Sequence, residues 1–138
     1  MRYAISACLC GIPCRYDGKS KPNNKALKLY RNEDCVLICP EVLGGLDTPR
    51  TPCEISGGRV IDINGEDKTA QYISGAHEVL KICKENSVTT AILKQRSPSC
   101  GSSEIYDGSF SGRLIPGCGI CAALLKDNSI KVISEEDL

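Results

Sequence analysis

The sequence predicts an α/β fold, in which one domain has a mainly parallel, Rossmann-like sheet with helices on both faces. Two observations support this fold class. Apolar runs of strand length alternate with longer segments of helical periodicity, and the 138 residues contain no repeat, low-complexity tract or second domain. A chain of this length buries a sufficient core as one unit. We therefore expect residues 1–138 to form a single domain.

The predicted strands are short apolar runs followed by long loops. Strands are expected at residues 2–7, 35–39, 59–63, 88–94 and 129–134. The segments after the first, second and fourth runs are rich in Gly, Pro and Ser, and residues 105–112 suggest a small hairpin or turn. Long loops in small domains are usually functional, so we expect a site at the carboxyl ends of the strands.

Three segments are predicted to be helices. The first runs to Asn32 from a cap at Asn23 or Asn24, with Ala26, Leu27 and Tyr30 on one face. The third covers residues 119–126. The second and longest starts at Thr69, and its apolar stripe contains Tyr72, Ile73, Ala76, Val79, Leu80 and Cys83.

Composition excludes several classes of function. Basic and acidic residues balance at 17 each, and there is one Phe and no Trp, which argues against nucleic acid as the main partner. No run approaches the ~20 apolar residues of a membrane span. The chain has 10 cysteines, but residues 1–18 have the pattern of a first strand and not of a secretory leader. We expect a reducing, cytoplasmic location; the oligomeric state is not readable from the sequence.

Three cysteines follow predicted strands. Cys8, Cys39 and Cys100 come at or just after the ends of three apolar runs, so a parallel sheet would gather them at one edge. Thiolates suit zinc, copper(I) or an iron–sulfur cluster. The only histidine, His77, is expected in mid-helix, away from this edge. Three ligands would leave one coordination position for water or substrate.

The other cysteines have competing explanations. Cys14 is the main rival ligand, and Cys10 and Cys53 lie in loops near the expected site. Cys35 and Cys83 fit core positions, since buried cysteines usually behave as small apolar residues. The pair Cys118 and Cys121 forms one C-x-x-C, for which we favour core packing over redox chemistry because a helix starts there.

Two polar residues are candidates for catalysis. Glu41 follows Cys39 by two positions, where a partly buried carboxyl would serve as general base or acid. Ser97 precedes Cys100 in the Ser-Pro-Ser-Cys corner and would bind substrate or relay a proton. Taken alone, each is better explained as a loop, turn or capping residue. Arg15, Asp17 and Arg50 would pair to hold loops or orient a polar heterocycle.

Four motifs in order resemble one family across essentially the whole chain. They are "SACLCGIPCRYDG", "CPEVLGGLDTPRTPCEI", "AILKQRSPSCGSSEIYDGSFSG" and "PGCGICAALL". Together they resemble the small bacterial domain family that includes the thiouracil desulfidases. The resemblance implies a [4Fe-4S] cluster held by Cys8, Cys39 and Cys100, with Glu41 and Ser97 as catalytic residues.

The reaction that the resemblance implies is non-redox. The sulfur of a thiolated pyrimidine would bind the open iron, water would attack the ring carbon, and Glu41 with Ser97 would manage protons. The substrate is therefore expected to be a small thio-heterocycle. Two other functions remain open on sequence: a module that binds or delivers metal or persulfide, and a cluster-free thiol enzyme with Cys100 as nucleophile. A pocket with only a structural role is the third alternative.

Overall fold

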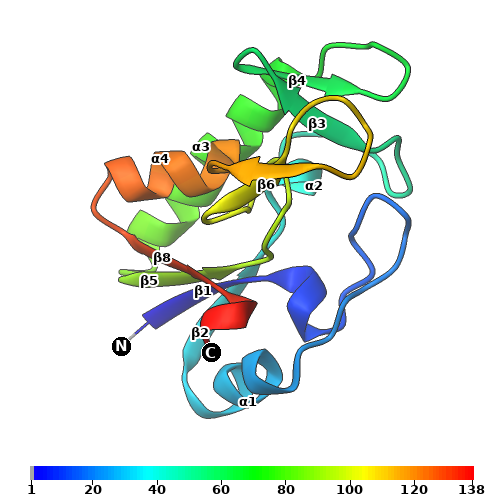
Figure 1. Ribbon diagram of the computed structural model, residues 1–138. Coiled ribbons are helices and arrows are strands. Elements are labelled where there is room, and N and C mark those ends of the chain that lie inside the picture. Colours follow the sequence, from blue (N-terminus) through cyan, green and yellow to red (C-terminus); the bar gives the residue numbers. More distant parts are fainter. Residues whose placement is uncertain (1) are drawn as a thin grey trace.

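Four parallel strands form the central sheet of the computed structural model, which describes residues 2–138 (Figure 1). They are β1 (Arg2–Ser6), β2 (Asp34–Ile38), β5 (Thr90–Leu93) and β8 (Lys131–Ser134), in the order β2-β1-β5-β8. Every pairing within this sheet is parallel. All four residues of β5 are buried, as is typical of a parallel strand covered on both faces. The predicted fold class is confirmed.

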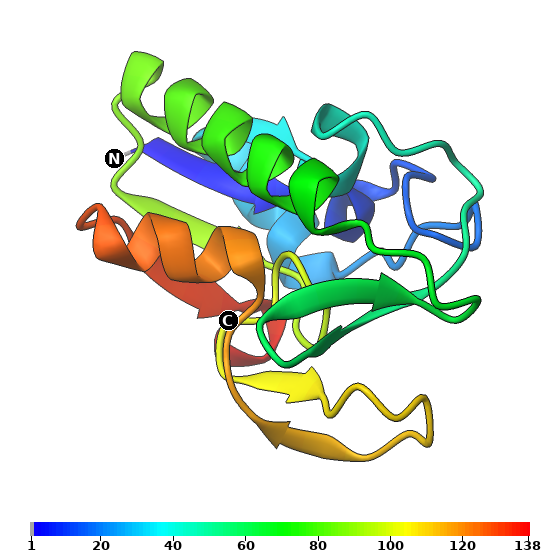
Figure 2. The same cartoon turned by 90° about the horizontal axis from the view of Figure 1, so that it is seen from above.

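Helices cover both faces of this sheet (Figures 1 and 2). On one face, α1 (Asn24–Asn32) packs over Ile5 and Ile92. On the other, α3 (Thr69–Glu85) and α4 (Ile120–Asp127) pack over Ala4 and Ala91. Neighbouring strand residues therefore point to opposite faces, as the period of a strand requires. Within residues 2–138, no helix has both the length and the apolar character needed to cross a membrane.

Two residues were wrongly predicted to lie on buried helix faces. Tyr30 is 43% exposed because the face of α1 that packs on the sheet contains Ala26 and Leu29, which leaves Tyr30 at its edge. Ile73 is 44% exposed because it lies at the edge of the α3 stripe, whose buried centre contains Tyr72 and Ala76. Periodicity located both helices correctly, but it predicted apolar faces wider than the faces that are buried.

Two antiparallel hairpins extend from the sheet (Figure 2). The first pairs β3 (Cys53–Ser56) with β4 (Arg59–Asp62), and the second pairs β6 (Glu104–Tyr106) with β7 (Leu114–Pro116). The second hairpin was predicted. The first strand of the other was wrongly assigned to a loop, although Gly57 and Gly58 both have positive φ and form the tight turn typical of a two-residue hairpin.

Short helices follow three of the parallel strands. A 3₁₀ turn, η1 (Ala7–Cys10), follows β1; α2 (Pro40–Leu43) follows β2; and a second 3₁₀ turn, η2 (Glu135–Asp137), follows β8. The helix α2 was expected to be loop, because four residues are too few to show helical periodicity. The backbone of α2 crosses α3 at Gly44 and Gly75, where an added Cβ would collide with the other helix. This close crossing fixes the position of Glu41.

Candidate active site

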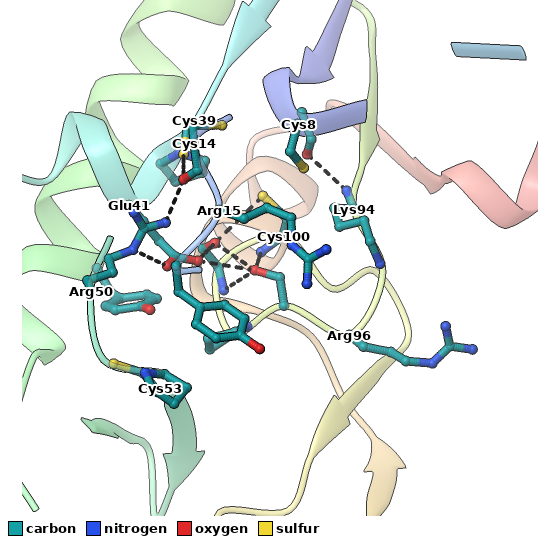
Figure 3. Close-up of a pocket in the computed structure, with 18 of the residues that line it drawn as sticks. Cys8, Cys14, Arg15, Cys39, Glu41, Arg50, Cys53, Lys94, Arg96 and Cys100 are labelled. Atoms are coloured by element: carbon teal, nitrogen blue, oxygen red, sulfur yellow. Dashed lines mark hydrogen bonds and ion pairs between the residues drawn. The ribbon is translucent and has the colours of Figure 1, made fainter. Parts of the chain in front are cut away.

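A pocket of about 630 Å³ lies beyond the carboxyl ends of β1, β2 and β5 (Figure 3). Its walls come from segments that are far apart in the chain. They include the residues just after these three strands, the loop around Cys14, and both hairpins. The pocket is therefore at the edge of the sheet where the sequence predicts a site.

The structure brings Cys8, Cys39 and Cys100 to this pocket (Figure 3). Cys8 lies in η1, Cys39 is the residue before α2, and Cys100 lies in the corner after β5. Burial raises the pKa of the Cys8 thiol to about 11 and that of Cys100 to about 12. The charge of Cys39 raises both further, so the three thiols are close enough to disfavour simultaneous ionisation. A bound cation of soft character would offset this repulsion.

A fourth thiol, Cys14, lies beside Cys39. The Cys14 side chain hydrogen-bonds Cys39 and lowers the pKa of the Cys39 thiol, while the pKa of Cys14 itself is raised. The Cys39 Sγ is also 3.8 Å from the Cys14 carbonyl oxygen, to which Arg50 Nη2 donates at 2.9 Å. Cys14 thus remains a rival ligand on geometry.

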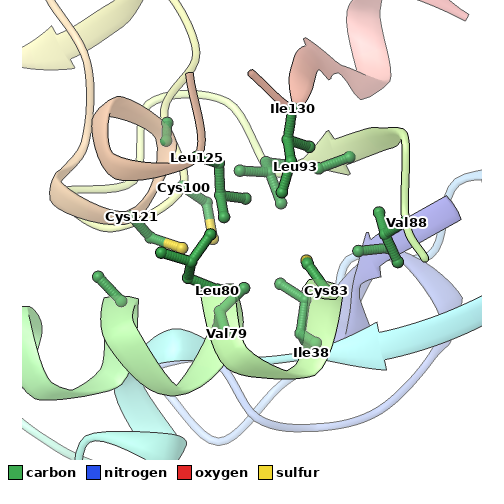
Figure 4. Close-up of a cluster of buried hydrophobic side chains, with 14 residues drawn as sticks. Ile38, Val79, Leu80, Cys83, Val88, Leu93, Cys100, Cys121, Leu125 and Ile130 are labelled. Atoms are coloured by element: carbon green, nitrogen blue, oxygen red, sulfur yellow. The ribbon is translucent and has the colours of Figure 1, made fainter. Parts of the chain in front are cut away.

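The remaining cysteines lie mostly in apolar surroundings. Cys83 and Cys121 are buried in the core between α3, α4 and the sheet, in the same cluster as Cys100 (Figure 4). Cys118 is only partly buried; its thiol donates to the Ser102 carbonyl oxygen at 3.2 Å. All ten cysteines are free thiols, including both members of the C-x-x-C motif. Cys10 and Cys35 pack against the α1 side of the core, and Cys53 lines the pocket.

Glu41 is held in the pocket by hydrogen bonds to both carboxylate oxygens. Its Oε1 accepts from Arg50 Nε at 3.0 Å, and its Oε2 accepts from Ser99 Oγ at 2.8 Å. The side chains of Glu41 and Arg50 are only 12% and 8% exposed, so this ion pair is largely removed from water. A buried, paired carboxylate of fixed orientation is suited to accept a proton from a bound molecule.

Ser97 is a capping residue, one of the two roles that the sequence allowed for it. Its Oγ accepts from the backbone N–H groups of Ser99 and Cys100, both at 3.1 Å, and so caps the corner that carries Cys100. Its distance to Glu41 Oε2 is 3.4 Å, longer than the 2.8 Å contact of Ser99. The two hydroxyls are 2.8 Å apart, which places Ser99 between Ser97 and Glu41.

Ser99 and Arg50 complete the surroundings of Glu41. Ser99 was missed by sequence reasoning, although it belongs to the same Ser-Pro-Ser-Cys motif, in which a tight turn brings both hydroxyls to one side. Arg50 was proposed only as a loop or heterocycle residue. It also donates to the Asp47 carbonyl oxygen and so ties the loop after α2 to the pocket. Arg15, which also lines the pocket, pairs with Asp17 at 3.8 Å.

The start of α4 fixes the corner that carries Cys100. The backbone N–H groups of Ile120 and Cys121 donate to the carbonyl oxygens of Pro98 and Ser99, at 2.8 and 2.9 Å. A Cβ at Gly119 would lie 2.5 Å from the Ser99 carbonyl carbon and oxygen, so only glycine permits this approach. The "PGCGIC" motif therefore positions the "SPSCG" motif.

The comparisons with known proteins show the family of this chain. The 2-thiouracil desulfurase family matches residues 4–137, and the chain therefore belongs to this enzyme family, as its motifs predicted. "Uncharacterized protein YbbK" from Bacillus subtilis (strain 168) is 45% identical, and the alignment covers 97% of this chain and 95% of that protein. The solved structure of a [4Fe-4S]-dependent thiouracil desulfidase, TudS, matches with a TM-score of 0.94 at 43% identity, covering 99% and 92% of the two chains.

Proposed function

We propose that this chain is an iron–sulfur-dependent enzyme that converts thiouracil and water into uracil and hydrosulfide without net oxidation or reduction. The observation that carries the proposal is one pocket lined by three strand-end thiols and a buried, paired carboxylate. Membership of the 2-thiouracil desulfurase family supports the reaction. Similarity over almost the whole chain to a desulfidase described as [4Fe-4S]-dependent supports the cofactor.

The pocket residues fit a cluster held by Cys8, Cys39 and Cys100. Their soft sulfur donors are those that iron–sulfur clusters use, and a cation would relieve the mutual repulsion of buried thiolates. Within residues 2–138 no three His, Cys, Asp or Glu side chains converge tightly enough for a single metal ion. When bound, a three-cysteine cluster supplies an open iron, which acts as a Lewis acid toward the soft thiocarbonyl sulfur.

Glu41 is the residue proposed to move the proton. Its Oε2 would accept a proton from the water that attacks the thiocarbonyl carbon, and Arg50 would hold the carboxylate in place. The oxygen of this water becomes the carbonyl oxygen of uracil, and the carbon–sulfur bond breaks to release sulfur as hydrosulfide. Ser97 and Ser99 would orient the acceptor oxygen, since both hydroxyls face it.

The proposed setting is a reducing compartment, the cytoplasm. Ten free thiols in one chain of 138 residues are typical of proteins kept reduced. The proposed partner is a small thiolated heterocycle, and the proposed catalytic unit is the whole domain of residues 1–138.

The alternative with Cys100 as a free nucleophile is disfavoured by the site. Burial raises the pKa of Cys100 to about 12, and its surroundings on the α4 side are the apolar core. A nucleophilic cysteine normally has the opposite environment, with a lowered pKa and access to solvent. Metal or persulfide delivery leaves the ion pair of Glu41 and Arg50 without a function.

Cluster content and desulfuration should be measured together on protein reconstituted without oxygen. We expect about four iron and four acid-labile sulfide per chain. Cys8→Ala, Cys39→Ala and Cys100→Ala should each lose iron, while Cys118→Ala, the matched control outside the pocket, should retain it. The cluster-loaded protein should convert 2-thiouracil to uracil, which chromatography measures. One hydrosulfide should be released for each uracil formed. Full activity in Cys8→Ala, or in iron-free protein, would refute the proposal.

A further inference from the structure

Aromatic side chains are scarce in this chain but concentrated around one pocket. The sequence has five Tyr, one Phe and no Trp. Four of these six side chains line the pocket: Tyr16, Tyr72, Tyr106 and Phe110. Such a concentration is expected where a flat, unsaturated ring binds, because aromatic side chains stack on ring faces.

Phe110 is held at the pocket by an unusual backbone. It has φ of 56°, in the left-handed region that bulky residues rarely adopt. Glu54 of β3 stabilises this conformation, because its Oε1 accepts from the backbone N–H groups of Gly108 and Phe110, at 2.9 and 3.1 Å. At Gly108, φ is 94° and a Cβ would lie 2.7 Å from the Ile55 carbonyl oxygen. The tip of the second hairpin is thus fixed against the first.

The other three aromatic residues are less suited to contact a ring. Tyr72 is 1% exposed and is part of the α3 stripe. Tyr16 has the guanidinium of Arg15 over its ring, 5.8 Å from the centroid, so one face is already covered. Tyr106 is fixed within β6, where it pairs with Leu114. Phe110 alone combines a ring without a hydroxyl, a place in the pocket wall and a conformation imposed from outside its own hairpin.

We propose that Phe110 is the specificity-determining residue that contacts the face of the substrate's heterocyclic ring. This inference rests on the proposed function and adds to it that the pocket selects ring compounds over open-chain thiocarbonyls. Backbone strain persists where surrounding structure imposes it, which is common at ligand sites. Here the strain places the only Phe of the chain against the cavity that also contains the thiols.

The test compares ligands with and without a ring. Uracil has the ring but no sulfur, and thiourea has the N–C(=S)–N group of 2-thiouracil but no ring. For Phe110→Ala, Phe110→Tyr and Phe110→Leu, three quantities should be measured on reconstituted protein: the KM for 2-thiouracil, the Ki of thiourea against it, and the Kd of labelled uracil by equilibrium dialysis. Leu114→Ala is the matched control, because Leu114 is on the same hairpin, 38% exposed, and outside the pocket lining.

We expect Phe110→Ala to raise the KM for 2-thiouracil and the Kd of uracil about tenfold, while the Ki of thiourea changes less than twofold. Phe110→Tyr should have the wild-type KM for 2-thiouracil and Kd of uracil, whereas Phe110→Leu should not. Leu114→Ala should leave this KM, this Kd and the Ki of thiourea unchanged. Wild-type uracil affinity in Phe110→Leu, or equal losses for uracil and thiourea, would show that Phe110 only packs the hairpin. If the wild type converts no 2-thiouracil, the proposed function fails, and the dialysis with uracil still decides this inference.

Discussion

Glu41 illustrates how much of the site depends on single side chains. Both of its carboxylate oxygens are engaged, by Arg50 on one side and by Ser99 on the other. Arg50 in turn binds the carbonyl oxygens of Cys14 and Asp47, so one guanidinium links three segments of the pocket wall. A planar donor with several N–H groups can make these bonds together, which a lysine cannot.

Glu41→Gln should lower kcat about 10²- to 10⁴-fold, the usual contribution of a general base, because an amide cannot accept the proton. Iron content should be unchanged, since Glu41 is not among the proposed ligands. Chromatographic assay of uracil, with iron analysis of the same sample, checks both. The exposed Glu78 of α3 provides the control Glu78→Gln, which should behave as wild type. Wild-type turnover in Glu41→Gln would exclude it as the base.

At the scale of elements, two contacts determine where the site residues lie. The first is the crossing of α2 and α3 at Gly44 and Gly75, and the second is the hydrogen bonding of the Ser-Pro-Ser-Cys corner to the start of α4. In both places the backbones approach directly, without side chains between them. Cys39, Glu41 and Cys100 therefore lie on short segments of backbone that these contacts hold in place.

Gly75→Ala should lower the free energy of unfolding by about 1–3 kcal/mol, because the new methyl group would collide with the backbone of α2 at Pro40. Alanine is the better helix former by about 1 kcal/mol, so a net loss of stability would identify the collision as the cause. Urea denaturation of metal-free protein measures it. Ser74→Ala, on the exposed side of the same helix, should be neutral or slightly stabilising. A gain of stability in Gly75→Ala would contradict the close crossing.

Asp62 makes the first hairpin sensitive to acid. The backbone N–H of Glu66 donates to its carboxylate and, with the hydroxyl of Thr51, holds the pKa of Asp62 below its usual value. A lowered folded pKa contributes stability that is present above about pH 4 and is lost as pH falls through the folded value. Asp62→Asn should therefore be less stable than wild type at pH 7, and the difference should shrink at pH 3. Urea midpoints at the two pH values test this; an equal difference at both would contradict it.

The sequence predicted the elements that have a clear period or length. Alternating strands and helices indicated the parallel sheet, and the strand ends indicated where Cys8, Cys39 and Cys100 would meet. Periodicity could not show α2, which has one turn, or β3, which lies among prolines and glycines. Nor could it identify Ser99 and Phe110, because their places depend on how separate loops pack together, which a single sequence does not encode locally.

At the scale of the whole molecule, the proposed cluster would connect three segments that enter the pocket from different strands. A ligand bound only by the folded state stabilises that state. Reconstituted protein should therefore unfold at a higher Tm than metal-free protein, and an iron chelator should remove the difference. Anaerobic calorimetry measures it. Cys100→Ser should show one Tm with or without reconstitution; a wild type whose Tm does not depend on the cluster would count against a structural link between the three segments.

The wide separation of the pocket thiols along the chain has a consequence for how the enzyme matures. Cys8, Cys39 and Cys100 are brought together by the parallel pairing of β1 with β2 and with β5, and not by a local run of cysteines. A nascent chain leaving the ribosome presents them one at a time, and the third is made only after most of the domain. Insertion of the proposed cluster would therefore follow folding of the chain. Cells short of iron or sulfide would accumulate a folded but inactive enzyme that is ready to be loaded.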